Sequence, residues 1–436
     1  MGKISRPLSV PNVLMIRFYK KAAFVIVVGL ILTRIASGAP ATLVLNEAFG
    51  VPIFADEFLW DDNAQDVATR LEWPEESKTS LESSFRRYPA AGELILGCRP
   101  YSNALYSVKG KASSISLVFA NKGDAVVYSL WANNNPQLSR QRQSQLRKFP
   151  QQIQNDKKKL TEVLTKLFGE PLADRFGQGR ETRESVKRWD WNGHAFLLAS
   201  PRDEYVALRV MSTESADAGG KLRIPDSVIR EVVANRIEQR ANGDVILKDI
   251  PMVAQGPKGY CVPATWERVM RYMGVPADMY VLAMAGQTQA GGGTPIDAIT
   301  AGARESIILS GRRVNTVSMN FKVSSVANYI DQGLPIMWDM FSTPTYNMVV
   351  DHRVALRRAI SDPALWKKEL AGARAAAKKL IKDYTHGHVC MIIGYNKITG
   401  EIAVSDSWGP EYAERWITSE EALAVTRAQA VMLINF

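Results

Sequence analysis

Residues 255–265 of this chain read Gln255-Gly256-Pro257-Lys258-Gly259-Tyr260-Cys261-Val262-Pro263-Ala264-Thr265. The glutamine stands six positions before a cysteine that opens a helical pattern, in which apolar residues recur at helical spacing until Gly274 ends the run. A proline at position 263 is compatible with the first turn of a helix and with no deeper position. The segment therefore predicts a helix that begins at Cys261 and places the thiol at its N-terminus.

Two polar residues far downstream complete a set of reactive side chains. His388 opens the apolar, strand-like run 388–395, and Asp406 precedes Ser407-Trp408-Gly409. A helix N-terminus and a nearby imidazolium both favour a thiolate. In this interpretation Cys261 attacks a carbonyl, His388 protonates the leaving group, and Asp406 holds the productive tautomer of His388. The amide of Gln255 and the backbone N–H of Cys261 form the oxyanion hole.

Length and charge bound the class of protein. With 436 residues the chain is too long for one ordinary core, so two domains after a leader are expected. Residues 1–38 hold six basic residues and no acid, which leaves +4 of the formal net charge of +10 for the rest of the chain. A surplus of that size is ordinary for so long a chain and removes most of the support for nucleic-acid binding.

The first 38 residues have the layout of a secretory signal peptide. Basic residues end at Lys20-Lys21, an apolar run extends from Ala22 to Leu32, and small residues suited to cleavage follow. This run is shorter than the roughly 20 apolar residues that span a bilayer, so a membrane anchor is disfavoured. We expect export to the periplasm or the extracellular space, with no stable membrane insertion after leader removal. Met15 is an alternative to Met1 as the start residue.

The three cysteines, Cys98, Cys261 and Cys390, are too few for a disulfide framework. The four histidines and three cysteines show no ligand spacing, so no metal and no organic cofactor are expected. Cys390 lies two residues after His388 and shares its strand face. We interpret Cys390 as a small core residue rather than a second reactive thiol.

Residues 39–244 are predicted to form an α+β domain without a motif that names a function. The run 189–198 indicates a β-hairpin around Asn192-Gly193, residues 157–168 indicate a helix, and the polar segment 230–242 is helical in pattern. Gly243-Asp244 marks the boundary to a second domain at 245–436, which carries the reactive side chains.

The segments 255–272, 388–395 and 406–409 together resemble the papain-like cysteine peptidases. Within them the C39-like branch is the most similar, with a glutamine, then Cys-Gly-Pro-Ala, then an apolar helix that ends near Tyr-Gly. The resemblance implies a helix bearing the cysteine packed on an antiparallel sheet bearing the histidine. It assigns the roles given above to Gln255, Cys261, His388 and Asp406, and it favours His388 over His386 as the base.

The chain departs from the family pattern in two places. Val262 stands where the family has glycine, which predicts a crowded cleft, and the stretch between Trp338 and His388 is longer than expected. We predict an exported cysteine peptidase that hydrolyses peptide bonds of a peptide or protein substrate through a thioester acyl-enzyme. A transglutaminase-type acyl transferase and a catalytically silent peptide-binding domain stay as alternatives. The sequence leaves the substrate and the oligomeric state open.

Overall fold

The computed structural model describes residues 41–126, 136–201, 204–221, 223–359, 362–380 and 382–436. Helices and two antiparallel sheets make up this part of the chain, which confirms the predicted α+β class. The predicted signal peptide and both candidate start residues lie outside the described residues. Within the described ranges, no helix has the length and apolar character needed to cross a membrane.

An eight-stranded sheet forms the first half of the chain. Its strands in spatial order are β1 (Glu75–Lys78), β2 (Glu82–Arg87), β3 (Ser102–Val108), β4 (Lys111–Asn121), β8 (Tyr205–Ser212), β7 (His194–Ala199), β6 (Glu184–Trp191) and β5 (Leu172–Phe176). The predicted hairpin is the pair β6 and β7. It turns at Asn192 and Gly193 because both residues adopt the positive φ of a tight hairpin turn, 42° and 79°.

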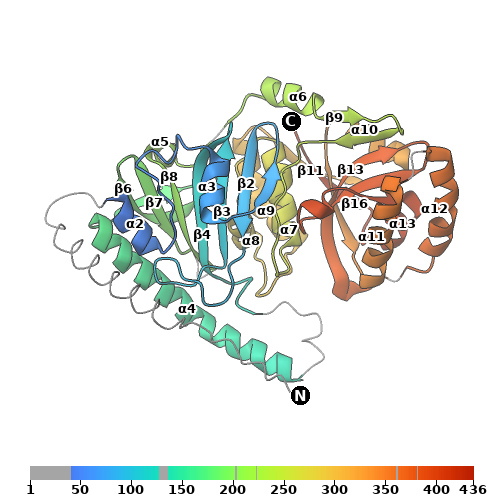
Figure 1. Ribbon diagram of the computed structural model, residues 1–436. Coiled ribbons are helices and arrows are strands. Elements are labelled where there is room, and N and C mark those ends of the chain that lie inside the picture. The colour runs from blue at the N-terminus through green and yellow to red at the C-terminus, as the bar shows by residue number, and fades with distance from the viewer. Residues whose placement is uncertain (1–40, 127–135, 202–203, 222, 360–361, 381) are drawn as a thin grey trace, which may run out of the picture.

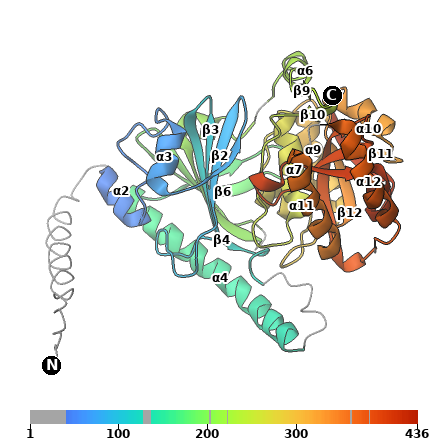
Figure 2. The same ribbon diagram turned by 45° about the vertical axis from the view of Figure 1, so that its right-hand side comes forward.

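Three helices cover one face of this sheet: α2 (Thr42–Phe49), α3 (Ala64–Leu71) and α4 (Pro136–Phe168). Their apolar side chains form one core with residues of the sheet such as Trp189, Phe196 and Leu208. The helix predicted at 157–168 is the last part of α4, which runs along the sheet and beyond its edge (Figure 2). The short helix α5 (Thr213–Asp217) follows β8.

A second sheet organises the C-terminal half. Its strands in spatial order are β11 (Arg313–Ser318), β16 (Ala430–Asn435), β12 (Ile336–Phe341), β13 (Gly387–Asn396), β10 (Asp244–Leu247) and β9 (Ile237–Gln239). The strand β14 (Glu401–Ser405) pairs with β13 and with β15 (Arg415–Thr418). His388 is therefore the second residue of a long strand that hydrogen bonds to neighbours on both sides.

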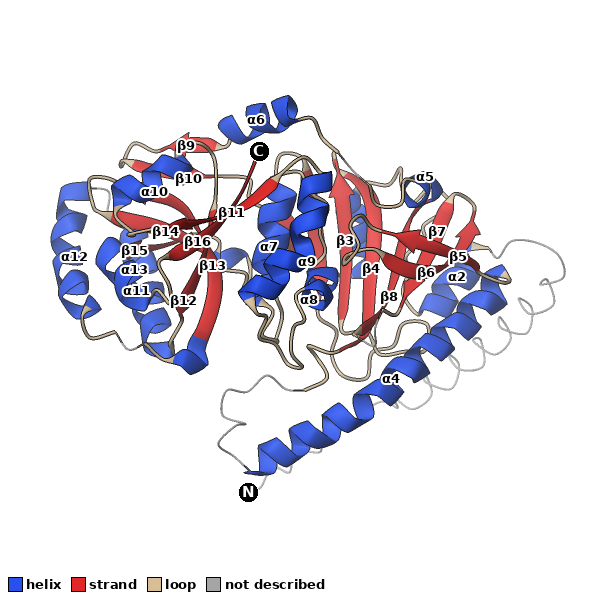
Figure 3. Cartoon of the chain, turned by 180° about the vertical axis from the view of Figure 1, so that it is seen from behind, coloured by secondary structure: helices blue, strands red, loops and turns tan. Residues whose placement is uncertain are grey.

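Helices cover both faces of the second sheet. One face packs against α7 (Cys261–Tyr272), α8 (Met279–Ala285) and α9 (Ile296–Leu309), and in Figures 1 and 3 these helices lie between the two sheets. The other face packs against α10 (Val323–Ile330), α11 (Pro344–Ala359) and α13 (Ser419–Val425). The helix α12 (Pro363–Ala377) lies outside α13. The long stretch between Trp338 and His388 thus contributes a helical layer.

The predicted boundary between Asp244 and Val245 falls inside β10. This strand pairs with β13 and β9, so it belongs to the second sheet. The helix α6 (Asp226–Ala234) also contributes Ile229 and Val233 to the core beneath α7. The segment 230–242 was predicted as helix, but it is helical only as far as Ala234 and then forms β9. Because β9 and β10 belong to the second sheet and α6 packs in its core, the proposed boundary moves to a point before Asp226. The division into domains itself stays a prediction.

Candidate active site

The nucleophile candidate Cys261 is the first residue of α7, as the sequence predicts. The helix ends at Tyr272, close to Gly274, whose φ of 70° is the left-handed conformation that stops a helix. The hydroxyl of Thr265 donates to the carbonyl of Val389 at 3.0 Å, so the first turn of α7 is tied to β13 one residue beyond His388. The N-terminus of α7 therefore lies at the start of β13.

Hydrogen bonding and charge between the Cys261 and His388 side chains shift the pKa of both groups. Burial opposes ionisation of the Cys261 thiol, but the hydrogen bond and the charge of His388 outweigh it, aided by the backbone N–H groups of Val389 and Val262. The pKa of Cys261 therefore lies below its ordinary value. The structure thus brings together two groups that stand 127 positions apart in the sequence.

Asp406 orients the imidazole from the other side. The Nε2 of His388 is 2.7 Å from the Oδ1 of Asp406, so Nδ1 is the ring nitrogen left to interact with Cys261. Burial lowers the pKa of His388, but Asp406 and Cys261 raise it more, to about 9. The indole of Trp408 lies over the imidazole with ring centroids 4.7 Å apart. His386, the competing base, instead pairs with Asp383 at 2.8 Å.

Arg415 is a residue of the site that sequence reasoning missed. Its Nε and Nη2 donate to the Oδ2 of Asp406 at 2.9 and 2.6 Å, and both side chains are buried, with 2% and 0% exposed. Burial raises the pKa of Asp406, but the charge of Arg415 and the bond to His388 bring it below its ordinary value. Asp351 of α11 holds the Nη1 of Arg415 at 2.9 Å. The unexpectedly long stretch before His388 thus braces the orienting carboxylate.

Gln255 is held by two bonds. Its backbone N–H donates to the carbonyl of Ser407 at 2.8 Å, and its Nε2 donates to the carbonyl of Lys258 at 2.7 Å. The first bond ties Gln255 to the residue after Asp406. The second fixes the side-chain amide to Lys258, three residues before Cys261, and within the described residues no group accepts the second N–H of that amide.

Val262 does not crowd the cleft, contrary to the expectation from the sequence. Its side chain is 5% exposed and packs in the core between α7 and the second sheet. A residue in the first turn of a helix points away from its predecessor by about 100° around the axis, so Cys261 and Val262 face different surroundings.

A buried arginine on α7 links three segments of the site. Arg268 donates through Nε to the carbonyl of Pro251 at 2.9 Å and through Nη2 to the hydroxyl of Ser405 at 2.6 Å. Its Nη1 lies 3.3 Å from the hydroxyl of Ser407. Burial lowers the pKa of Arg268 to about 10, against the charge of Asp406, which raises it. The segments before Gln255 and around Asp406 are thus fastened to the helix of the nucleophile.

The first half of the chain holds the segment that leads to Cys261. Glu76 of β1 accepts from the backbone N–H of Ala254 at 2.8 Å, and the hydroxyl of Ser77 accepts from the N–H of Met252 at 2.9 Å. The hydroxyl of Tyr88 donates to the carbonyl of Ala254. A Cβ at Gly256, which has a φ of 71°, would lie 2.7 Å from the Tyr88 ring, so this close approach requires glycine.

Lys258 makes a buried ion pair with the first half of the chain. Its ammonium lies 3.2 Å from the Oδ1 of Asp124, beyond the end of β4, and both side chains are buried, with 0% and 8% exposed. The rings of Tyr88, Tyr260 and Tyr280 surround the ammonium at 4.8, 5.6 and 5.4 Å. Burial lowers the pKa of Lys258, and Asp124 opposes that shift. Three tyrosine rings and the carboxylate of Asp124 thus hold Lys258, which lies between Gln255 and Cys261 in the sequence.

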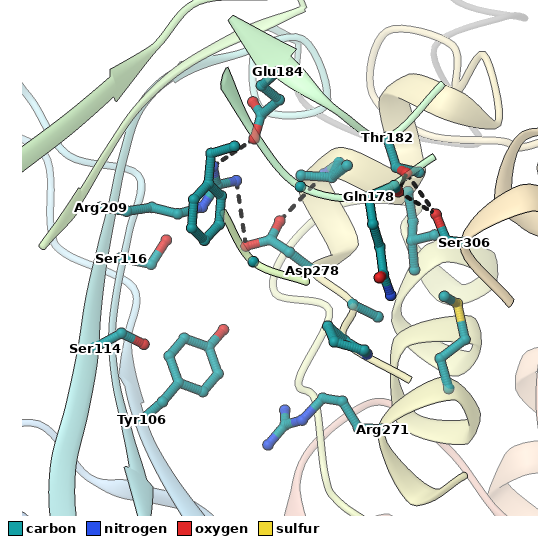
Figure 4. Close-up of a pocket in the computed structure, with 18 of the residues that line it drawn as sticks. Tyr106, Ser114, Ser116, Gln178, Thr182, Glu184, Arg209, Arg271, Asp278 and Ser306 are labelled. Atoms are coloured by element: carbon teal, nitrogen blue, oxygen red, sulfur yellow. Dashed lines mark hydrogen bonds and ion pairs between the residues drawn. The ribbon is translucent and has the colours of Figure 1, made fainter. Parts of the chain in front are cut away.

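A cavity of about 310 Å³ lies between the two halves of the chain (Figure 4). Arg209 of β8 bonds there to Glu184, and Asp278 lies 3.9 Å from it across the interface. Met270 and Arg271 from the C-terminal end of α7 line this cavity, whereas Cys261, His388 and Asp406 do not. It belongs to the contact between the halves.

The other two cysteines are buried and free. Burial raises the pKa of Cys98 to about 12 and raises that of Cys390, whose sulfur packs 3.7 Å from the Sδ of Met340 in the core. Among the described residues no group of three or more histidine, cysteine, aspartate or glutamate side chains is arranged to hold a metal ion. That the protein works without a metal or cofactor stays a prediction.

A thiol at a helix N-terminus, an imidazole, a carboxylate and an amide are the groups that cysteine peptidases use. Residues 247–429 match the model of the Peptidase_C39 like family. This match confirms the resemblance for the C-terminal part of the chain and identifies it as a cysteine peptidase-type domain. Among curated proteins none matches the chain.

Proposed function

We propose that the protein is an exported cysteine peptidase in which Cys261, His388, Asp406 and Gln255 act together. The observation that carries the proposal is the Cys261–His388–Asp406 arrangement, with its lowered thiol pKa and raised imidazole pKa. These shifts favour the thiolate and imidazolium pair near neutral pH. The papain-like packing of the nucleophile helix on the sheet of the histidine is part of the same proposal.

In the proposed reaction the Cys261 thiolate attacks the carbonyl carbon of a peptide bond. The oxyanion that forms accepts hydrogen bonds from the backbone N–H of Cys261 and from the free N–H of Gln255. His388 gives its proton to the leaving amine, and a thioester joins the acyl group to the sulfur. Water, deprotonated by His388, then attacks the thioester, releases the acid and restores the thiol.

A transglutaminase-type acyl transferase shares every step as far as the thioester. It differs only in the second acceptor, an amine in place of water. Incubation of the protein and a peptide substrate with a primary amine separates the two. A peptidase yields mainly free acid, whereas a transferase yields mainly the amide.

The proposal is tested by profiling the purified protein on a peptide library beside its Cys261→Ala variant. Cleavage by the first and none by the second is the expected result. Equal cleavage by both proteins, or no cleavage by either across the pH range tested, favours a silent peptide-binding domain instead. The burial of Val262 in the core removes one argument for that alternative.

Cys261 is expected to react selectively with iodoacetamide near neutral pH. Its pKa lies below the ordinary value, whereas burial raises the pKa of Cys98 to about 12. Since each pKa unit changes the thiolate fraction tenfold, we expect Cys261 to be alkylated at least about tenfold faster than Cys98. Peptide mapping of the labelled, folded protein measures both rates. Equal rates at the two positions contradict an activated thiol.

The dependence of kcat/KM on pH is expected to be bell-shaped. The acidic limb reports protonation of the Cys261–His388 pair, and the alkaline limb, near pH 9, reports loss of the His388 proton. Because Asp406 raises the pKa of His388, Asp406→Asn is expected to move the alkaline limb to lower pH. An alkaline limb that stays in place in this variant contradicts the role of Asp406.

A further inference from the structure

A concentrated positive charge lies at the far end of the nucleophile helix. Two adjoining hollows of about 520 and 620 Å³ share Arg223, and together they are lined by seven basic residues and two carboxylates. Their formal charge of +5 exceeds the surplus of +4 that the chain carries beyond residue 38. The remaining surface is therefore close to neutral, and the positive charge is collected in one concave region.

Within the described parts of the chain, most of these basic groups form no ion pair. Among the described residues, five of the seven are exposed and form no ion pair: Arg183, Lys221, Arg223, Arg304 and Arg313. The two carboxylates that line the hollows are bound to other groups. Asp226 pairs with the buried Arg312, and Glu305 accepts a hydrogen bond from the backbone N–H of Arg180. The hollows thus present uncompensated guanidinium and ammonium groups to solvent.

Apolar side chains lie among the charges. Ile308 and Leu309 of α9 line the two hollows and are 56% and 48% exposed. Phe436 also lines the first hollow, but its ring is covered by Arg230 and Arg312. A site for single-stranded nucleic acid needs exposed aromatic rings for base stacking, and a flat membrane surface needs protruding rather than recessed basic groups. An acidic peptide segment with aliphatic side chains fits both the charges and the exposed apolar surface.

The hollows are distinct from the proposed cleavage site. The Nε of Arg312 donates to the carbonyl of Met273, at the C-terminal end of α7, whereas Cys261 begins that helix. Twelve helical residues separate the ends by about 18 Å at 1.5 Å per residue. An extended chain covers this distance with at least about 6 residues. A segment bound in the hollows therefore lies outside the cleft that holds the scissile bond.

We propose that these two hollows form an exosite for an acidic segment of a protein substrate, at least about 6 residues from the bond that is cleaved. This inference rests on the proposed peptidase function in one respect only: that function makes the bound protein a substrate. Occupation of the exosite raises the local concentration of the scissile segment at Cys261. It lowers KM for long acidic substrates and leaves kcat for short peptides unchanged.

The test measures binding to the full chain carrying Cys261→Ala, so it needs no catalysis. The probe is a fluorescently labelled twelve-residue peptide of glutamate pairs alternating with leucine, and its glutamine counterpart is the comparison. The variant Arg304→Glu/Arg313→Glu reverses two exposed, unpaired charges of the exosite. The variant Lys367→Glu/Lys368→Glu makes the same change on the exposed face of α12 and is the control.

Anisotropy titrations at about 0.05 M and about 0.2 M salt are expected to give binding of the acidic peptide that weakens with salt. We expect an approximately tenfold loss of affinity in the exosite variant, about 1.4 kcal/mol, and no loss in the control. Equal affinity in the two variants overturns the proposal. The proposal is also overturned if duplex DNA or an anionic phospholipid vesicle loses affinity in the exosite variant while the acidic peptide does not. Cleavage of short peptides by Arg304→Glu/Arg313→Glu with Cys261 intact shows whether the proposed peptidase function stands independently.

Discussion

Arg415→Met is expected to lower kcat/KM by about a hundredfold, the lower end of what a positioned general acid contributes. Among the described residues Arg415 is the only permanently charged side chain that hydrogen bonds to Asp406, and both side chains are buried. Without it, burial dominates and the pKa of Asp406 rises. A protonated Asp406 no longer supports the charge of His388, so the pKa of His388 falls and the thiolate loses its counter-ion.

The same substitution is expected to reduce stability in a pH-dependent way. Removing one partner of a buried ion pair costs about 3–5 kcal/mol when the other stays charged. In the wild type the lowered pKa of Asp406 stabilises the fold above the unfolded pKa of about 3.9, and this contribution is lost as pH falls through the lower folded value. In Arg415→Met the folded pKa is raised instead. The loss of stability therefore grows as pH rises and is relieved by acid.

Arg357→Met is the matched control for Arg415→Met. Arg357 pairs with Asp244 at 2.7 Å and with Glu401, close to the C-terminal end of β13. That end is about 26 Å from His388 along the strand, at about 3.3 Å per residue. Both variants should lower the free energy of unfolding, measured by urea denaturation. Only Arg415→Met should move the alkaline limb of kcat/KM; a shift of equal size in Arg357→Met contradicts a positioning role for Arg415.

The sequence predicted those parts of the site whose signals are local. The start of α7 follows from Pro263 in its first turn, its end from Gly274, and the β6–β7 turn from Asn192 and Gly193. These residues act through their own backbone preferences, which a sequence displays directly. The α+β class and the family resemblance rest on such segments, and both are confirmed.

The sequence did not predict the contacts that hold these parts together. Lys258 and Asp124 are 134 positions apart, and nothing near either residue indicates that it is buried. Arg415 looks like one basic residue in a short strand, and its place behind Asp406 depends on how β14 and β15 pair. The prediction of a helix over β9 was wrong for a related reason. The polar sequence of this three-residue strand forms a strand only because β10 offers an edge to pair with.

Asp124→Asn is the second substitution with a large expected effect, since it leaves the Lys258 ammonium buried without an anion. Both side chains are almost inaccessible, so the loss of stability is expected at about 3–5 kcal/mol. The aromatic rings of Tyr88, Tyr260 and Tyr280 compensate only part of that charge. Lys258 then shifts, and its carbonyl no longer holds the Nε2 of Gln255. We expect kcat/KM to fall at least about tenfold, a fraction of what a complete oxyanion donor contributes.

Glu184→Gln separates this effect from general damage to the first half of the chain. It removes the carboxylate of another buried pair, Glu184 and Arg209, for which no hydrogen bond or ion pair to the described residues 252–260 is present. Urea denaturation should show a comparable loss of stability for both variants. Under conditions where both are fully folded, only Asp124→Asn should lose activity, and Glu184→Gln should keep the wild-type kcat/KM.

A double-mutant cycle with Gln255→Ala decides whether Asp124 acts through the amide. If the first half of the chain serves catalysis by fixing Gln255, then Asp124→Asn costs little activity once Gln255 is alanine, and the two losses are not additive. Fully additive losses contradict this path and leave Asp124 with a structural role alone. The pair Asp124→Leu/Lys258→Met should recover stability because no charge stays buried. It should not recover kcat/KM fully, since an apolar side chain at position 258 does not reproduce the anchored position of the backbone carbonyl.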